Sequence, residues 1–220
     1  MVLKPVAYYR CPLEGKFGLP RQAGLASALE GEVVLEPEFK HPDALRGLEG
    51  FDYLWLIWGF HLNREGSAEG HLTVRPPRLG GNERLGVFAT RSPYRPNPLG
   101  LSSVRIVDID PSRGVIMVSG SDLADGTPVF DIKPYVEYAD SHPGVHSGFV
   151  DASDWTRLEL VLPENKDFEG LTPTDVDAIC QLICEDPRPQ YQHDPQRVYH
   201  LSFRGRDIAF RIEGNRAVIL

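Results

Sequence analysis

The sequence predicts a mainly β protein, a sandwich or a closed barrel, followed by a smaller region of helix and strand. Short runs rich in β-branched and aromatic residues recur up to residue 135, separated by Gly, Pro, Asn and Asp clusters. The strong helix signal comes only later, at Thr172. A hydrophobic content of 41% with 25% charged residues is typical of an ordinary globular protein.

The first region contains several extended runs that we expect to form strands. They lie at residues 2–9, 32–36, 51–60, 85–90, 101–109, 114–119 and 129–135. The turn-forming segment 141–151 then indicates a linker. We therefore expect two domains, residues 1–145 and residues 146–220.

The second region begins with the predicted helix. Thr172 suits the N-cap, Pro173 the first helical position and Asp175 the first turn. Its apolar positions on one face are Val176, Ile179, Cys180, Ile183 and Cys184. Two prolines, at 187 and 189, should end it near residue 186. Residues 198–203, 207–212 and 217–220 predict three strands in a meander.

The cysteines and the N-terminal sequence indicate the cellular compartment in which we expect the protein. Cys11, Cys180 and Cys184 form an odd set without C-x-x-C spacing, which argues against a disulfide framework and a structural zinc site. We expect no metal and reduced thiols. No secretion signal is visible at the N-terminus, and the longest apolar stretch, residues 51–60, is too short to span a bilayer. We expect a cytoplasmic protein.

An arginine-rich segment stands out in a chain of formal net charge -8. Between residues 75 and 105 the only acid is Glu83, and the bases are Arg75, Arg78, Arg84, Arg91, Arg95 and Arg105. Guanidinium groups are matched to phosphate and carboxylate, so the segment predicts an anionic ligand. Prolines at 93, 96 and 98 should stiffen this loop. Residues 137–186 are strongly acidic, so a polyanion should bind in one orientation only.

Several enzyme classes lose support because their motifs are missing. No two glycines lie two positions apart, so the glycine-rich turn of dinucleotide-binding folds and most methyltransferases is absent. The sequence also lacks G-x-S-x-G, G-x-x-x-x-G-K and H-E-x-x-H. A hydrolase elbow, a nucleotide triphosphatase and a zinc protease are therefore disfavoured.

Three polar segments have both a structural and a functional interpretation. Residues 16–22 form either a functional turn rich in hydrogen-bond donors or only a surface loop. His61 follows a buried strand, where it contacts a ligand or serves as a structural histidine. The acidic turn 122–128 binds a ligand or only turns the chain. After it, Asp131, Lys133 and Tyr135 alternate and so share one strand face.

Taken together, the ordered motifs KFGLPRQ, GVFATRSPYRPNPLGLS, DLADGTPVFDIKPY and EDPRPQY closely resemble the tRNA methyltransferase O (TsaA or YaeB) family. The resemblance covers nearly the whole chain. It implies a single-sheeted β-barrel with a small C-terminal α+β domain, which binds S-adenosylmethionine without a Rossmann-like domain. It also implies a homodimer that methylates the exocyclic amine of threonylcarbamoyl-adenosine beside the anticodon of tRNA.

The resemblance implies a set of cofactor-binding residues. They are Pro20, Arg21, Gln22, His61, Leu62, Arg91, Leu101, Asp122, Leu123, Ala124, Asp125 and Gly126. The residue types suit the donor, because an arginine can bind its carboxylate, an aspartate its ribose hydroxyls or amine, and a leucine its adenine. Leu62 stands where a polar residue is expected.

The residues that would bind the methyl acceptor are assigned from their chemistry and from their place in the motifs. Arg95 or Lys133 is the candidate for the threonylcarbamoyl carboxylate, and Asn97 or Tyr135 for the base or its urea. Arg75, Arg78 and Arg84 are candidates for tRNA phosphates, or else form salt bridges to the acidic domain. Asp125, Asp131 or a backbone carbonyl could accept the amine proton.

Two rival functions remain at this point. A non-catalytic RNA-binding barrel would use the same arginines to bind phosphates, without saturable affinity for S-adenosylmethionine. A methyltransferase of the same fold that acts on a small molecule would bind the donor without dependence on tRNA.

Overall fold

The structure is a computed structural model that describes residues 2–63, 72–76, 83–152, 156–163, 168–189, 192 and 194–220. Its strands are β1 Ala7–Arg10, β2 Glu30–Leu35, β3 Tyr53–Gly59, β4 Thr73–Val74, β5 Leu85–Gly86, β6 Leu99–Asp110, β7 Val115–Ser119, β8 Pro128–Pro134, β9 Glu159–Val161, β10 Val198–Phe203, β11 Arg206–Glu213 and β12 Arg216–Ile219. Its α-helices are α1 Pro42–Leu45, α2 Glu137–Asp140 and α3 Pro173–Cys184. Short 3-10 turns lie at Pro37–Phe39, Leu48–Gly50, Val87–Ala89 and Gly148–Val150.

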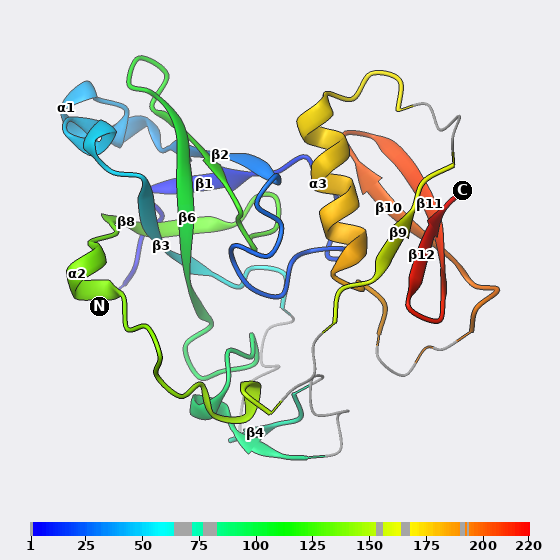
Figure 1. Ribbon diagram of the computed structural model, residues 1–220. Helices are drawn as coiled ribbons and strands as arrows, with labels where there is room; N and C mark the ends of the chain where they lie inside the picture. The colour runs from blue at the N-terminus through cyan, green and yellow to red at the C-terminus, as the bar shows by residue number, and fades with distance from the viewer. Residues whose placement is uncertain are drawn as a thin grey trace.

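The predicted single-sheeted barrel is confirmed. One sheet closes in the order β1-β2-β7-β6-β3-β8, and its neighbouring strands are antiparallel (Figure 1). Alternation along β3 places Leu54, Leu56 and Trp58 in the barrel core, with 0%, 0% and 6% of their surface exposed. Burial of each leucine contributes about 1.5–3 kcal/mol to stability.

One predicted strand was wrong beyond its first residues. Residues 85–90 were expected to be extended, but only Leu85–Gly86 pairs, with Thr73–Val74 of β4. The next residues form a 3-10 turn because Thr90 donates both its amide and its hydroxyl to the carbonyl of Val87, which is buried. These local hydrogen bonds take the place of the cross-strand hydrogen bonds of a sheet.

The helix and meander of the C-terminal region are confirmed. Thr172 and Asp175 form the expected capping box of α3: the Thr172 hydroxyl accepts from the Asp175 amide at 3.1 Å, and Asp175 accepts from the Thr172 amide at 3.0 Å. Strands β10, β11 and β12 follow as an antiparallel meander. A short strand that was not predicted, β9, adds to β12 in parallel.

The apolar face of α3 differs from the predicted one. The core of this region is lined by Ala178, Ile179, Leu182 and Ile183, whereas the two cysteines lie at the edge of that face and are half-buried. Burial raises the pKa of both Cys180 and Cys184. Both groups therefore remain thiols near neutral pH.

The segment between β1 and β2 belongs to the C-terminal core rather than to the barrel core. Leu13, Ala26 and Leu29 are fully buried against side chains of α3 and of the meander, Ile179 and Phe203 among them. Figure 1 shows this blue segment leaving the barrel and returning beside α3. Residues 11–29 therefore connect the two parts of the chain. The division at residue 145 stays a prediction.

Candidate functional site

A half-buried carboxylate, that of Asp122, anchors the acidic turn between β7 and β8. The Ser102 hydroxyl of β6 donates to Asp122 Oδ1 at 2.5 Å and accepts from the Trp58 indole at 2.9 Å. Ser102 is 2% exposed, and the neighbour of the carboxylate in the chain, Leu123, is fully buried. Burial raises the pKa of Asp122, although the Ser102 bond opposes the shift. The turn is thus held rigidly against the barrel.

Two further segments meet at Asp122. The Arg91 guanidinium donates to the Gln22 amide oxygen, which joins the arginine-rich loop to the segment after β1. The positive charge of Arg91 and a hydrogen bond from the Ala23 amide both lower the pKa of Asp122, in opposition to burial. The structure therefore brings together Gln22, Arg91 and Asp122, which are far apart in sequence.

His61 lies against the same turn from the end of β3. Its Nδ1 is 3.4 Å from the Thr127 hydroxyl, which donates to the Ala124 carbonyl at 2.7 Å. Burial lowers the pKa of His61, with Lys16 adding to the effect and the Asp125 backbone opposing it. A neutral imidazole beside the turn is therefore favoured at neutral pH.

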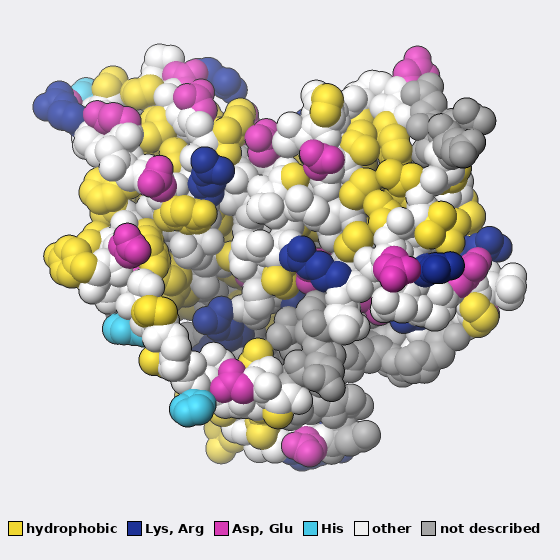
Figure 2. Space-filling model, in the orientation of Figure 1, with side chains coloured by type: hydrophobic (Ala, Val, Ile, Leu, Met, Phe, Trp, Pro, Cys, Tyr) yellow, Lys and Arg dark blue, Asp and Glu magenta, His cyan; other side chains and the backbone are white. Residues whose placement is uncertain are grey.

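Asp125 and Leu62 border a cleft of about 550 Å³ between the barrel and the C-terminal part. Asp125 Oδ1 accepts from the Cys11 amide at 3.0 Å, and its Oδ2 is 3.7 Å from Arg10 Nη1. The Lys16 ammonium donates to the Leu62 carbonyl. Figure 2 shows the notch that separates the two parts at the top of that view. Gly126 completes the turn at φ 76°, a conformation that favours glycine.

Pro20 and Arg21 lie on the other side of the segment that carries Gln22. Pro20 is buried, and Arg21 is half-buried and donates to the Asp186 carbonyl at 3.3 Å, just after α3. Arg21 therefore contacts the C-terminal part, while Gln22 contacts Arg91. The segment is held from both sides.

Leu101 and the β8 residues lie on the outer face of the barrel. Leu101, Ile57 and Asp131 are neighbours across β6, β3 and β8, and Leu101 is 58% exposed. Asp131 forms an ion pair with Lys133 at 3.1 Å. Tyr135 packs on the Trp55 ring at 5.7 Å between ring centroids. These residues share a face, as alternation predicted, but that face is not the one on which Asp122 is buried.

The remaining acceptor-side candidates lie on loops. Arg95 is half-buried and donates to the Thr90 carbonyl at 3.1 Å, which braces the loop that carries Arg91. Asn97 is exposed just before β6. Arg75 and Arg84 are exposed at the adjoining ends of β4 and β5, and within the described ranges neither forms an ion pair. Arg78 lies outside the described residues.

Sequence reasoning missed the side chains that support the site. Ser102, Thr127 and Lys16 all lie within the quoted motifs but were given no role. Ser102 had a detectable signal, because its hydroxyl lies between Gly100 and Val104 at the alternate positions of the run, the face that turns inward. The partners of Thr127 and Lys16 come from distant segments, so no local pattern reveals them.

The described residues contain neither a metal-binding cluster nor a membrane-spanning helix. Among those residues, no group of three or more His, Cys, Asp or Glu side chains could hold a metal ion. No helix in the same ranges is long and apolar enough to cross a membrane.

Known proteins are similar to this chain in both sequence and fold. Residues 8–141 match the domain family described as tRNA-methyltransferase O N-terminal domain. Residues 162–220 match the family described as TrmO C-terminal domain. A protein of Escherichia coli (strain K12) named tRNA (adenine(37)-N6)-methyltransferase is 40% identical over 194 residues, which cover 85% of this chain and 82% of that protein. A Pseudomonas aeruginosa protein named putative S-adenosylmethionine-dependent methyltransferase RcsF is 40% identical over 213 residues, covering 94% and 90%.

A solved structure agrees along the whole chain. The crystal structure of TrmO from Pseudomonas aeruginosa matches with a TM-score of 0.78 at 30% identity, covering 100% of this chain and 97% of that chain. With both halves matched in sequence and the barrel matched in structure, this chain belongs to the tRNA-methyltransferase O family.

Proposed function

We propose that this protein transfers a methyl group from S-adenosylmethionine to N6 of threonylcarbamoyl-adenosine beside the anticodon of tRNA. The observation that carries the proposal is the meeting of Gln22, Arg91 and Asp122 from three separate segments. The printed names of the Escherichia coli and Pseudomonas relatives support the reaction class and the donor.

The residues at this point fit the donor chemically. A guanidinium suits a carboxylate, and a partly buried aspartate suits hydroxyl or ammonium donors. Asp122 is fixed by Ser102 before any ligand arrives, which lowers the ordering cost of binding. S-adenosylmethionine supplies an activated methyl group on a sulfonium. The task left to the protein is to hold the acceptor amine in line with that methyl group.

An acceptor for the amine proton should assist the transfer. Asp125 suits this role better than Asp131, because it lies on the same turn as Asp122 and borders the cleft. Asp131 is paired with Lys133 on the outer face of β8. The positions of both aspartates support Asp125 as the acceptor in this proposal.

Arg75 and Arg84 are the proposed phosphate contacts for tRNA. They project from the β4–β5 ribbon, which lies below the barrel in Figure 1. In the described part of the chain neither is neutralised by an acid, which favours phosphate binding over salt bridges to the acidic domain. Such contacts should make tRNA binding weaken steeply with salt.

A homodimer is part of the proposal. The outer face of β3 and β6 leaves large apolar side chains exposed, with Tyr53 at 44% and Leu101 at 58%. Pairing of this face with a second copy would bury them and place Leu101 against the partner. Sedimentation equilibrium should give twice the chain mass of 24.6 kDa. A monomer at all concentrations would contradict this part.

The reaction is tested by transfer of labelled methyl from S-adenosylmethionine to purified tRNA. We expect label on N6 of the modified adenosine in tRNA that carries threonylcarbamoyl, and none in tRNA that lacks it. Salt-sensitive tRNA binding without donor binding would favour the RNA-binding barrel. Donor binding without any tRNA product would favour the small-molecule methyltransferase.

A further inference from the structure

The cleft between the two parts of the chain contains an arginine from the C-terminal part. Its lining includes Leu62, Ala124 and Asp125, which belong to the predicted donor site, and Arg204 from the turn between β10 and β11. None of the sequence motifs pointed to Arg204. Its position makes the C-terminal part a wall of the candidate site.

Arg204 is held in place from three directions. Its backbone is in the left-handed region at φ 48°, which is uncommon for a residue with a side chain. Its amide donates to the Pro12 carbonyl at 2.8 Å. Its Nε donates at 2.8 Å to Oδ1 of Asp175, a carboxylate that is itself fixed by the capping box. This conformation follows from the tight turn between the paired residues Phe203 and Arg206, where Arg204 and Gly205 both have positive φ.

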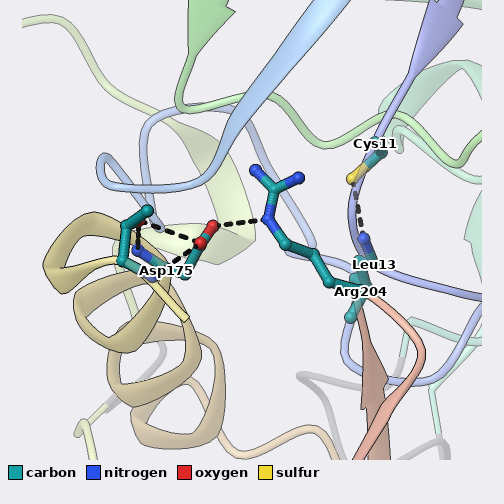
Figure 3. Close-up of polar contacts among 5 residues, drawn as sticks. Cys11, Leu13, Asp175 and Arg204 are labelled. Atoms are coloured by element: carbon teal, nitrogen blue, oxygen red, sulfur yellow. Dashed lines mark hydrogen bonds and ion pairs between the residues drawn. The ribbon is translucent and has the colours of Figure 1, made fainter. Parts of the chain in front are cut away.

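The two terminal nitrogens of Arg204 face away from α3. Figure 3 shows the guanidinium between Asp175 and Cys11, with only Nε directed at Asp175. Within the described ranges these two nitrogens have no hydrogen-bond partner. They remain available to an acceptor in the cleft.

The two acids in the cleft lining have partners other than Arg204. Both oxygens of Glu14 cap the turn, since they accept from the Ser202 hydroxyl at 2.8 Å and the Gly205 amide at 2.9 Å. Asp125 accepts from the Cys11 amide and faces Arg10. Neither acid is bonded to Arg204, whose ion pair is with Asp175, so its two terminal nitrogens face a cleft that Asp125 also lines.

A cation and an anion across one cleft suit an amino-acid group. We propose that the terminal nitrogens of Arg204 bind the carboxylate of an α-amino-acid moiety in the cleft that Asp125 also borders. The inference rests on the proposed function, which supplies two such carboxylates. One belongs to the methionyl end of the donor, and the other to the threonyl group of the acceptor.

The test uses Arg204→Lys in the full-length protein. Lysine can keep an ion pair with Asp175 but removes the planar fork that binds a carboxylate at two points. Arg206→Lys, two residues along the same hairpin and outside the cleft lining, is the matched control. Thermal unfolding of each variant checks that the fold is intact.

The first arm compares S-adenosylhomocysteine with methylthioadenosine, which lacks the amino-acid end, by calorimetry. If the donor carboxylate binds Arg204, Arg204→Lys should weaken S-adenosylhomocysteine about tenfold to a hundredfold and leave methylthioadenosine unchanged. The second arm compares tRNA with and without threonylcarbamoyl. If the acceptor carboxylate binds there, the variant should lose its preference for modified tRNA.

A selective loss in either arm supports the proposal and assigns the source of the carboxylate. Wild-type discrimination in both arms overturns it. Equal losses for S-adenosylhomocysteine and methylthioadenosine, with tRNA preference intact, mark a merely structural role and also overturn it. Failure of the proposed function looks different, because wild-type protein itself would then either bind no donor analogue or methylate no tRNA.

Discussion

Arg91 and Gln22 are joined by a hydrogen bond from guanidinium Nη1 to amide Oε1, across a sequence separation of 69 residues. The bond ties the proline-braced arginine loop to the segment between β1 and β2. Asp122 lies near this bond, because the charge of Arg91 lowers its pKa and its carboxylate accepts from the amide of Ala23, the residue after Gln22. Each of these three segments should therefore matter for donor binding.

Arg91→Ala should impair donor binding at least tenfold, because it removes a charged donor from the site and releases Gln22. Calorimetric titration with S-adenosylhomocysteine measures the effect. Salt-dependent tRNA affinity should change little. An unaltered donor affinity would show that Arg91 has only a structural part in this loop.

Arg75→Ala should have the opposite effect, a loss of tRNA binding with donor binding unchanged. The exposed guanidinium on the β4–β5 ribbon is a proposed phosphate contact, so its loss should weaken tRNA binding and reduce the salt slope by about 1. Donor affinity should stay at the wild-type value. Filter binding across a salt series gives the slope, and identical effects of Arg75→Ala and Arg91→Ala would refute this division of the arginines.

Asp122→Asn should change how stability depends on pH. Burial raises the pKa of Asp122, so the folded protein binds this proton more tightly than the unfolded chain does. The group therefore stabilises the fold at low pH, and this contribution is lost as pH rises through the folded pKa. Relative to wild type, the variant should gain stability as pH rises from the unfolded pKa of about 4 through the higher folded pKa. Thermal unfolding should show this trend, and a constant difference would contradict it.

Asp175→Asn should show the opposite dependence. Burial alone would raise the pKa of Asp175, but the bonds from Arg204 and Thr172 outweigh it and hold the pKa below its usual value. Its stabilisation is present above the unfolded pKa and is lost as pH falls through the folded pKa. The variant should lose about 1 kcal/mol at neutral pH through the weakened capping box. In unfolding scans this deficit should shrink in acid, and a deficit that persists there would argue against the ion pair.

Ile179→Ala should loosen the segment that carries Gln22. Ile179 is fully buried in the core that includes Leu13 and Leu29, so the truncation should cost about 2–5 kcal/mol. Amide hydrogen exchange in residues 13–29 should quicken. Leu54→Ala, an equally buried truncation in the barrel core, is the control and should leave that segment protected. Equal exchange in both variants would show that protection of this segment does not depend on the C-terminal core.

Local chemistry made much of the fold predictable. The β3 strand could be predicted because inward leucines alternate with outward residues, and α3 because Thr172, Pro173 and Asp175 specify its start. The closed barrel was implied by the family resemblance, but the order of its strands was not predicted, since alternation along a strand does not choose its neighbour. Residues 87–89 escaped prediction because local bonds from Thr90 overrode an extended pattern.

The site was less predictable for a related reason. Motif membership assigned Gln22, Arg91 and Asp122, and the structure shows that they meet. The Lys16 contact with the Leu62 carbonyl and the place of Arg204 at the cleft depend on how residues 11–29 pack into the C-terminal core. Such long-range packing leaves no periodic or spacing signal in the chain.

The central claim, that this barrel holds S-adenosylmethionine where Gln22, Arg91 and Asp122 meet, is tested most directly by titrating the folded wild-type protein with that donor in a calorimeter near neutral pH. The account predicts a saturable heat with one site per chain, sharply reduced in Arg91→Ala. Absence of any binding heat up to about 1 mM donor would contradict it.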